Sequence, residues 1–270
     1  MRYLISLFTL AVCGLCTWAG GPTLEDQLRK EYRGTEHLLR RFNAENRLKF
    51  DAEGNPQGKE TPGPWTLAGP VAINHVELKD GKLRLHGRRE ILVFQDKTKL
   101  AKRIKSDESF SIEIESSSGP DQEAQLRKAL ARVFIAKDEP LAPLLPDYWR
   151  DYITRLDLRH TEGEACVESK LPNAEAPLQP ASVAEGRKIH NVEPAYPSIA
   201  RRYGVGGMVE MRAVIDKGGN ISRVCLTTAA GAGLDDTLVE AVRQWKYRPY
   251  MVNGQPVEVE TIVRTDYHIP

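Results

Sequence analysis

The sequence predicts an α+β fold in two parts, with a β-rich domain first and a smaller mixed domain after it. Short alternating strands with tight turns recur between about residues 47 and 114, and apolar stripes at helical spacing follow them. The last 85 or so residues read helix, strand, strand, helix, strand. That order predicts a small antiparallel sheet with helices on one face. We therefore divide the chain into residues 1–19, 20–162, 163–185 and 186–270.

Composition limits the classes of function. The chain has 38 Lys and Arg against 37 Asp and Glu, a formal net charge of +1. No global field draws the protein to nucleic acid, and we expect no nucleic-acid partner. Hydrophobic residues make up 41% and charged residues 28%, which is typical of a globular protein.

The first 19 residues have the build of an export signal. A short positive start, Met1-Arg2, precedes an uncharged, mostly apolar run from Leu4 to Ala19. As a helix this run would be about 24 Å long, short of the roughly 30 Å hydrocarbon core. A cleaved signal peptide is the leading interpretation and an uncleaved membrane anchor the alternative. Either places the rest of the chain outside the cytoplasm.

The elements of residues 20–162 follow from local patterns. Thr23 is the expected N-cap of a helix at residues 24–33. Four or five short strands follow, forming a small sheet, sandwich or partial barrel. They are expected around residues 47–50, 71–78, 83–86, 91–94 and 110–114, with a hairpin turn at 79–82. Two helices end the block, one capped by Asp121 and carrying Leu126 to Phe134, the other at 146–156. Residues 163–185 contain three prolines and no apolar period, which indicates a linker.

The carboxy-terminal domain begins with a short helix from Ser198 to about Tyr203. Strands are expected from Val209 and from Ile221 to Thr228, joined by a turn at 216–220, and a helix begins at Leu234. A final strand from Val257 to Ile269 has one apolar and one polar side. Cys166 and Cys225 are the two cysteines that follow the export segment, and one disulfide between them is the prediction, with two free thiols as the alternative. No metal or cofactor site is expected.

This region resembles the TonB C-terminal domain family. The motifs that carry the resemblance stand in the family's order along the last third of the chain. They are Pro194-x-Tyr196-Pro197 with Ala200, Val205-x-Gly207-x-Val209, Gly218-Gly219, Leu234, Ala241-x-x-x-Trp245-x-Tyr247-x-Pro249 and Gly254-x-Pro256-Val257.

The resemblance implies a periplasmic protein for envelope transport. Its partners would be an outer-membrane TonB-dependent receptor, or another extended peptide, and a proton-driven motor complex in the inner membrane. The expected mode is strand addition at the edge of the last strand, where unpaired backbone groups meet an extended peptide. A homodimer through the same edge is a further possibility. The residues expected at the contact are Val257, Val259, Thr261, Val263, Thr265, Tyr267, Pro194, Tyr196 and Pro197. Those expected to be structural are Gly207, Gly218, Trp245, Pro249 and Gly254.

Two features depart from the family pattern. The apolar segment is short, and a linker of this length could reach only about 60 Å. A secreted interaction or scaffold module without energy coupling is therefore the alternative. The six histidines are scattered, and Ser198 lacks a nucleophile motif, so an enzyme is not expected.

Overall fold

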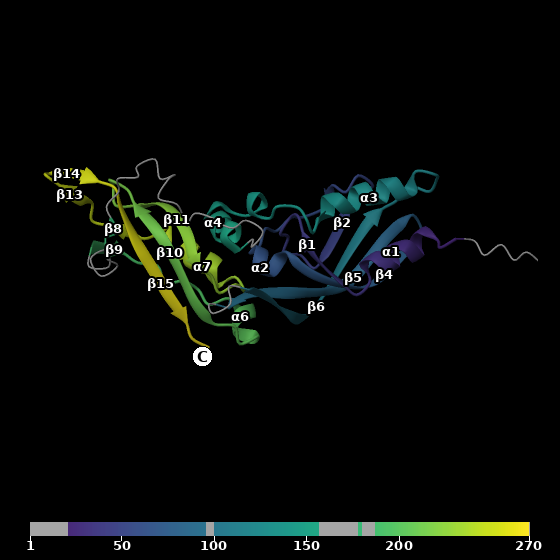
Figure 1. Ribbon diagram of the computed structural model, residues 1–270, viewed down its shortest axis with the longest axis horizontal. Coiled ribbons are helices and arrows are strands. Elements are labelled where there is room, and N and C mark those ends of the chain that lie inside the picture. Colours follow the sequence, from purple (N-terminus) through teal and green to yellow (C-terminus); the bar gives the residue numbers. More distant parts are fainter. Residues whose placement is uncertain (1–20, 96–99, 157–177, 180–186, 270) are drawn as a thin grey trace, which may run out of the picture.

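The computed structural model describes residues 21–95, 100–156, 178–179 and 187–269, in two halves placed end to end (Figure 1). The predicted export segment, Cys166 and most of the predicted linker lie outside the described residues. The first half contains α1 (Leu24–Tyr32), β1 (Thr35–Leu39), β2 (Arg47–Phe50), β3 (Pro56–Gln57), α2 (Trp65–Ala68), β4 (Pro70–Lys79), β5 (Lys82–Gln95), β6 (Leu100–Glu115), α3 (Gln122–Val133), β7 (Phe134–Ile135), the 3₁₀ helix η1 (Ala142–Leu144) and α4 (Asp147–Leu156). The second half contains β8 (Leu178–Gln179), β9 (Lys188–His190), α6 (Ser198–Arg202), β10 (Gly207–Ile215), β11 (Ile221–Thr228), α7 (Leu234–Val242), β12 (Lys246–Tyr247), β13 (Tyr250–Val252), β14 (Gln255–Val257) and β15 (Val259–Tyr267).

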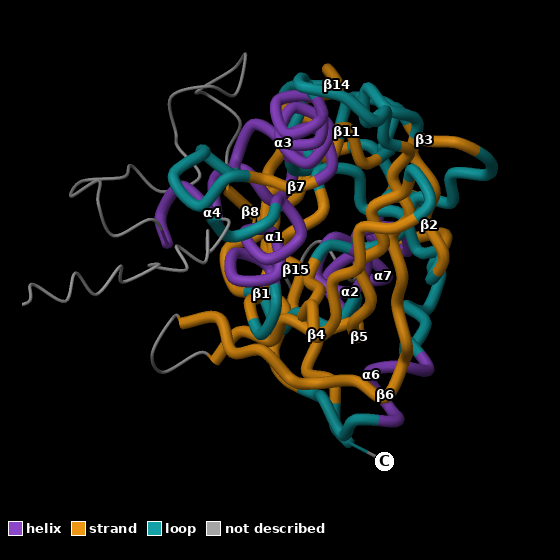
Figure 2. The backbone as a smooth tube through the Cα atoms, turned by 90° about the vertical axis from the view of Figure 1, so that its right-hand side faces the viewer, coloured by secondary structure: helices purple, strands orange, loops and turns teal. Residues whose placement is uncertain are grey.

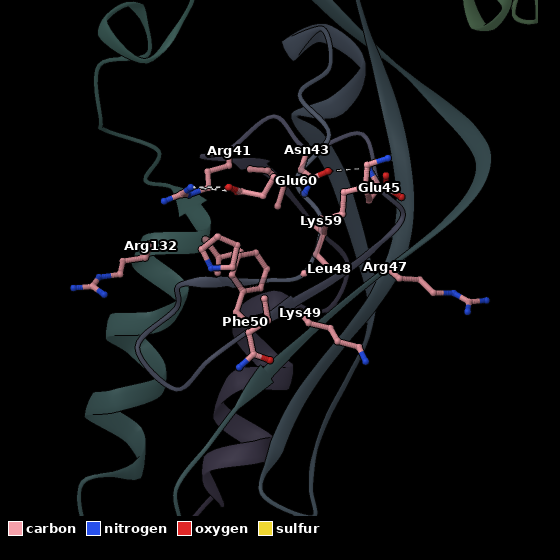
Figure 3. A pocket seen from close by; sticks show the side chains of 15 residues that line it. Arg41, Asn43, Glu45, Arg47, Leu48, Lys49, Phe50, Lys59, Glu60 and Arg132 are labelled. Atoms are coloured by element: carbon pink, nitrogen blue, oxygen red, sulfur yellow. Dashed lines mark hydrogen bonds and ion pairs between the residues drawn. The ribbon is translucent and has the colours of Figure 1, made fainter.

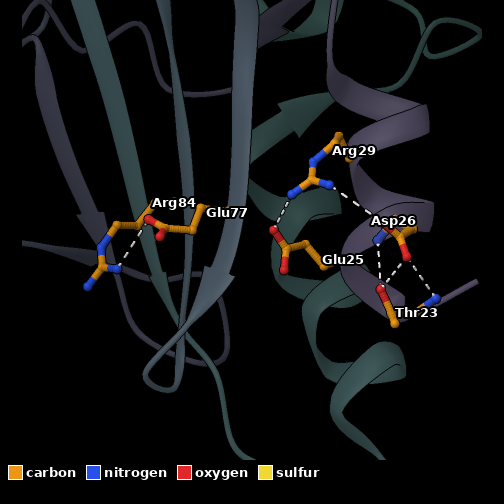
Figure 4. A network of polar contacts seen from close by, with 6 residues as sticks. All are labelled: Thr23, Glu25, Asp26, Arg29, Glu77 and Arg84. Atoms are coloured by element: carbon orange, nitrogen blue, oxygen red, sulfur yellow. Dashed lines mark hydrogen bonds and ion pairs between the residues drawn. The ribbon is translucent and has the colours of Figure 1, made fainter.

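Helix α1 begins where the sequence predicts. The Thr23 hydroxyl accepts a hydrogen bond from the Asp26 amide, and the Asp26 carboxylate accepts one from the Thr23 amide. This reciprocal capping box, drawn in Figure 4, satisfies two amides that the first turn would otherwise leave unpaired. The second predicted cap is only half right, because Asp121 occupies the N-cap position of α3 but its side chain makes no capping bond.

The first half is built on a single seven-stranded sheet of order β3-β2-β6-β5-β4-β1-β7. Its strands are longer than the predicted short ones, since β5 has 14 residues and β6 has 16. One face carries alternating apolar side chains and packs under α1 and α3. The other face is polar, with Arg84 lying between Glu77 of β4 and Glu113 of β6. Figure 4 shows the Arg84–Glu77 ion pair. The predicted hairpin between β4 and β5 is confirmed.

A buried arginine fixes the loop beside this sheet. Arg89 of β5 is 4% exposed and donates hydrogen bonds to Ala68 O, Asn43 O, Glu45 O and Asn46 Oδ1, at 2.6 to 3.0 Å. Its guanidinium also lies 4.5 Å from the centre of the Phe110 ring. Burial lowers the pKa of Arg89 to about 10. The buried charge is tolerated because its donors are used.

The second half has the predicted order of α6, β10, β11, α7 and β15. Its main sheet has the strand order β11-β10-β15-β8, and α7 packs on one face. The predicted final strand is interrupted at Glu258. Residues 255–257 belong instead to a small hairpin with β13, at the far end of the molecule (Figure 1). The prediction of one continuous strand from Val257 was therefore wrong.

The two halves share one apolar core, so a separate β-rich domain is not confirmed. Trp65, Phe94 and Trp149 from the first half belong to the same buried cluster as Leu226 and Leu238 from the second. Residues 90–95 of β5 run past the end of β4 and meet the second half directly. There Phe94 N donates to Ala230 O at 2.9 Å, and Ala232 N donates to Leu92 O at 2.8 Å.

A second contact joins the halves at their other side. Asp107 of β6 accepts hydrogen bonds from Arg202 at 2.6 Å and from the Tyr203 hydroxyl. Figure 2 shows α6 beside β6, close to the carboxy terminus. No helix in the described part of the chain is long and apolar enough to cross a membrane.

Candidate functional site

Strand β15 lies near the edge of the second sheet. Its inner side pairs with β10 along its whole length, from Val259 opposite Ile215 to Tyr267 opposite Gly207. Its outer side pairs with β8 only at Glu260 and Thr261. Among the described residues, no strand pairs with the outer side of β15 from Ile262 to Tyr267. This stretch is the open edge.

The side chains of β15 alternate between the core and the outer face. Val259, Thr261, Val263 and Tyr267 are at most 7% exposed, and Thr265 is half-buried. A partner strand on the open edge would therefore meet the backbone of the four buried residues rather than their side chains, whereas the side chain of Thr265 is partly accessible. Val257 lies in β14, away from this edge.

The outer face of β15 carries an apolar residue and charged ones. Ile262 is 36% exposed, and Arg264 and Asp266 follow it at every second position. Arg264 Nε donates to Glu210 Oε2 at 2.8 Å. Alternate side chains of a partner peptide would meet this mixed row.

The Pro194-Tyr196-Pro197 segment reaches the carboxy-terminal end of β15. The Tyr196 ring lies edge-on to the Tyr267 ring, with centroids 5.6 Å apart. The Tyr196 hydroxyl donates to Val205 O at 2.8 Å, and Pro197 occupies the N-cap position of α6. Two parts of the predicted contact set are thus brought together at one end of the open edge.

A hollow of about 540 Å³ lies at this same end. Its walls come from the β5–β6 pair, from the loop around Gly206 and from the end of β15, and include Phe94, Ile104 and Tyr267. A Cβ at Gly206 would lie 2.2 Å from Tyr267 O, so only glycine allows this close approach. The hollow joins the open edge to the first half.

The residues predicted to be structural lie at turns and packing positions. Trp245 Nε1 donates to Val192 O at 2.8 Å, and the Lys188 ammonium lies 3.4 Å from the centre of the Trp245 ring. Gly218 and Gly254 lie in hairpin turns, Gly207 opens β10, and Pro249 precedes β13. Their structural role stays a prediction.

Two buried carboxyl groups were missed by the sequence prediction. Asp235 is fully buried and accepts bonds from the Ala230 and Gly231 amides at 2.9 and 2.7 Å. Asp236 accepts a 2.7 Å bond from the Tyr148 hydroxyl of α4, across the boundary between the halves. Burial raises the pKa of Asp235 to about 8 and that of Asp236 to about 6. In the sequence the pair resembles ordinary acidic residues of a first helical turn, which are normally exposed.

A second cavity lies in the first half, away from β15. It has a volume of about 280 Å³ between β2, the loop after β3 and the end of α3. Leu48 and Phe50 form its floor, an Arg41–Glu60 ion pair lies at its mouth, and Arg47 and Lys49 point away from it (Figure 3). No group of metal-ligating side chains occurs in the described residues.

The predicted disulfide falls partly outside the described chain. Cys225 is disulfide-bonded and lies on β11, half-buried, between the buried Val224 and Leu226. The predicted partner, Cys166, is outside the described residues, so the pairing stays a prediction.

Comparison with known proteins agrees with the geometry of the second half. The family described as Gram-negative bacterial TonB protein C-terminal matches residues 192–269. Residues 192–269 are a TonB C-terminal domain. This TonB-like domain holds the whole of β15 and its open edge.

One curated relative and two solved structures also match part of the chain. Protein TonB of Vibrio cholerae serotype O1 is 39% identical over 67 residues, which are 24% of this chain and 28% of that protein. The chain thus spans just over a quarter of the length of this relative. The solution NMR structure of the Pseudomonas aeruginosa TonB CTD is 20% identical, covers 31% of this chain and 85% of that one, and has a TM-score of 0.28. The TonB2 structure of Vibrio anguillarum is 29% identical, covers 31% of this chain and 81% of that one, and has a TM-score of 0.26.

Proposed function

We propose that this protein is a periplasmic, TonB-like component of envelope transport that holds an extended peptide of an outer-membrane TonB-dependent receptor. The observation that carries the proposal is the open edge of β15 in a TonB C-terminal domain. Unpaired backbone groups at a strand edge bind an extended peptide through main-chain hydrogen bonds. The mixed row of Ile262, Arg264 and Asp266 then selects among peptide side chains.

The first half is packed firmly against the TonB-like domain. Three of the contacts that hold the halves together lie at separate places. Leu92 and Phe94 form backbone hydrogen bonds with Ala232 and Ala230. The Tyr148 hydroxyl bonds to Asp236, and Asp107 accepts bonds from Arg202 and Tyr203. A pull on β15 would therefore act on both halves at once. An anchored chain that contacts the inner-membrane motor would transmit force this way.

A secreted interaction module without energy coupling is the second candidate. The observation that favours it is the folded, tightly packed first half, which stands where a transducer needs a long spacer. The amino-terminal residue of the native protein separates the two candidates. A retained Met1 in the inner-membrane fraction supports the transducer, and a soluble chain that begins near Gly20 supports the module.

Disulfide trapping tests the peptide site. A Thr265→Cys variant places a thiol on the open edge, and Ser222→Cys places one on β11 at the opposite edge as the matched control. The probes are synthetic peptides that copy the periplasmic amino-terminal segments of TonB-dependent receptors from the same bacterium, each with one added cysteine. We expect mixed disulfides with Thr265→Cys and at least tenfold fewer with Ser222→Cys. Equal trapping at both positions would refute the proposed site.

A further inference from the structure

The edge of β15 is partly occupied by the chain itself. Leu178 lies opposite Glu260 and Gln179 opposite Thr261, in parallel orientation. These two residues form β8, inside the segment predicted to be an unstructured linker. The inference concerns the same edge as the proposed function and rests on it.

The sequence around β8 limits how far this pairing can extend. Pro177 and Pro180 flank the two paired residues, and proline has no backbone N–H to donate to a strand. The pairing that the structure describes spans two residues, whereas β15 has nine. A partner peptide without proline can form more backbone hydrogen bonds along the same edge.

Prolines and covering segments are the means by which natural proteins protect edge strands from pairing with other chains. Leu178 and Gln179 cover part of the edge of β15, and a proline stands on each side of them in the sequence. The described pairing is two residues long, which is short enough to be displaced.

We propose that Leu178–Gln179 is a placeholder strand that occupies the peptide-binding edge and is displaced by a longer partner peptide. The placeholder sets a minimum length of backbone pairing for any competing peptide. Such a peptide must pair well beyond Glu260 and Thr261 to displace a segment tethered to the same chain. A tethered segment competes at an effective concentration of about millimolar.

Hydrogen exchange of the full chain tests whether the edge is covered. The double variant Leu178→Pro/Gln179→Pro removes both backbone donors of β8, and Ala181→Pro is the control outside the paired residues. We expect exchange in the fragment spanning residues 258–262 to become at least tenfold faster in the double variant and to stay unchanged in the control. Unchanged exchange in the double variant would overturn the proposal. The urea midpoint of each variant checks that the fold is kept.

Binding of the chain's own segment in trans provides the second readout. The probe is a fluorescent synthetic peptide that copies residues 174–183. It should bind the double variant at least tenfold more tightly than the wild type or the Ala181→Pro control, because only the double variant frees the edge. Equal affinity for all three proteins would overturn the proposal. Neither readout uses a receptor, so failure here is distinguishable from failure of the trapping experiment at Thr265.

Discussion

Replacing Tyr148 by phenylalanine removes one hydroxyl from the boundary between the two halves. That hydroxyl donates a 2.7 Å hydrogen bond to Asp236 Oδ1, and Tyr148 and Asp236 are only 8% and 7% exposed. Burial raises the pKa of Asp236 to about 6, and the bond from Tyr148 opposes that rise. Without the hydroxyl, the pKa of the folded state rises further. The cost of Tyr148→Phe should therefore be greatest where Asp236 is ionised.

The magnitude follows from the charge of the acceptor. At pH 8 the lost bond is made to a carboxylate, and such bonds contribute about 1.5–3 kcal/mol. At pH 5 Asp236 is largely protonated, and the loss in the free energy of unfolding caused by Tyr148→Phe should fall to about 1 kcal/mol. The sign is fixed by linkage: a carboxyl whose pKa rises on folding binds more protons in the native state, so stability decreases as pH rises.

Urea unfolding followed by tryptophan fluorescence measures this difference. The wild type and Tyr148→Phe are compared at pH 5 and at pH 8, with Tyr32→Phe as the matched control. Tyr32 packs on His37 and Phe134 in the first half, away from both aspartates. A loss for Tyr148→Phe that is equal at both pH values, or larger at pH 5, would refute the reasoning.

Three further predictions concern stability. Because burial raises the pKa of Asp235 and Asp236, wild-type stability should fall between pH 5 and pH 8, and the double variant Asp235→Asn/Asp236→Asn should flatten that slope in the same urea assay. Arg89→Met leaves four buried or partly buried oxygens without their donor and should cost about 3–5 kcal/mol in the free energy of unfolding; a loss below 1 kcal/mol would contradict its structural role. Gly231→Ala places a Cβ 2.2 Å from Leu92 O at a φ of 83° and should cost about 2 kcal/mol or more in calorimetry, whereas an unchanged Tm would argue against the close contact between the halves.

Local chemistry made much of the fold predictable. The capping box at Thr23 and the apolar stripe of α3 depend on residues a few positions apart, and both were located. The hairpin between β4 and β5 and the order of elements in the TonB-like domain were also predicted. Each of these signals is local in sequence.

The missed features depend on contacts between residues that are far apart in the chain. Residues 90–95 looked like one short strand, yet they extend β5 onto Ala230 and Ala232. Trp149 of the first half belongs to the buried cluster that also contains Leu226 and Leu238 of the second half. Nothing within the sequence of either half reports such a contact.

The candidate site was predicted in outline but not in detail. The last strand was assigned to the sheet edge, and Tyr196 was assigned to the same site as Tyr267, which the structure places beside it. The pairing of Leu178 and Gln179 with that edge was not foreseen, since flanking prolines are typical of a linker. A two-residue strand has too short a pattern to be recognised from sequence.

The most direct test of the central claim is to locate a bound receptor peptide on the protein. Hydrogen exchange of the full chain is measured with and without a saturating receptor peptide identified by trapping. The account predicts new protection confined to the open edge of β15, from Ile262 to Tyr267, with none at β11 or around the cavity at Leu48. Protection at either of those places, with β15 unchanged, would contradict it.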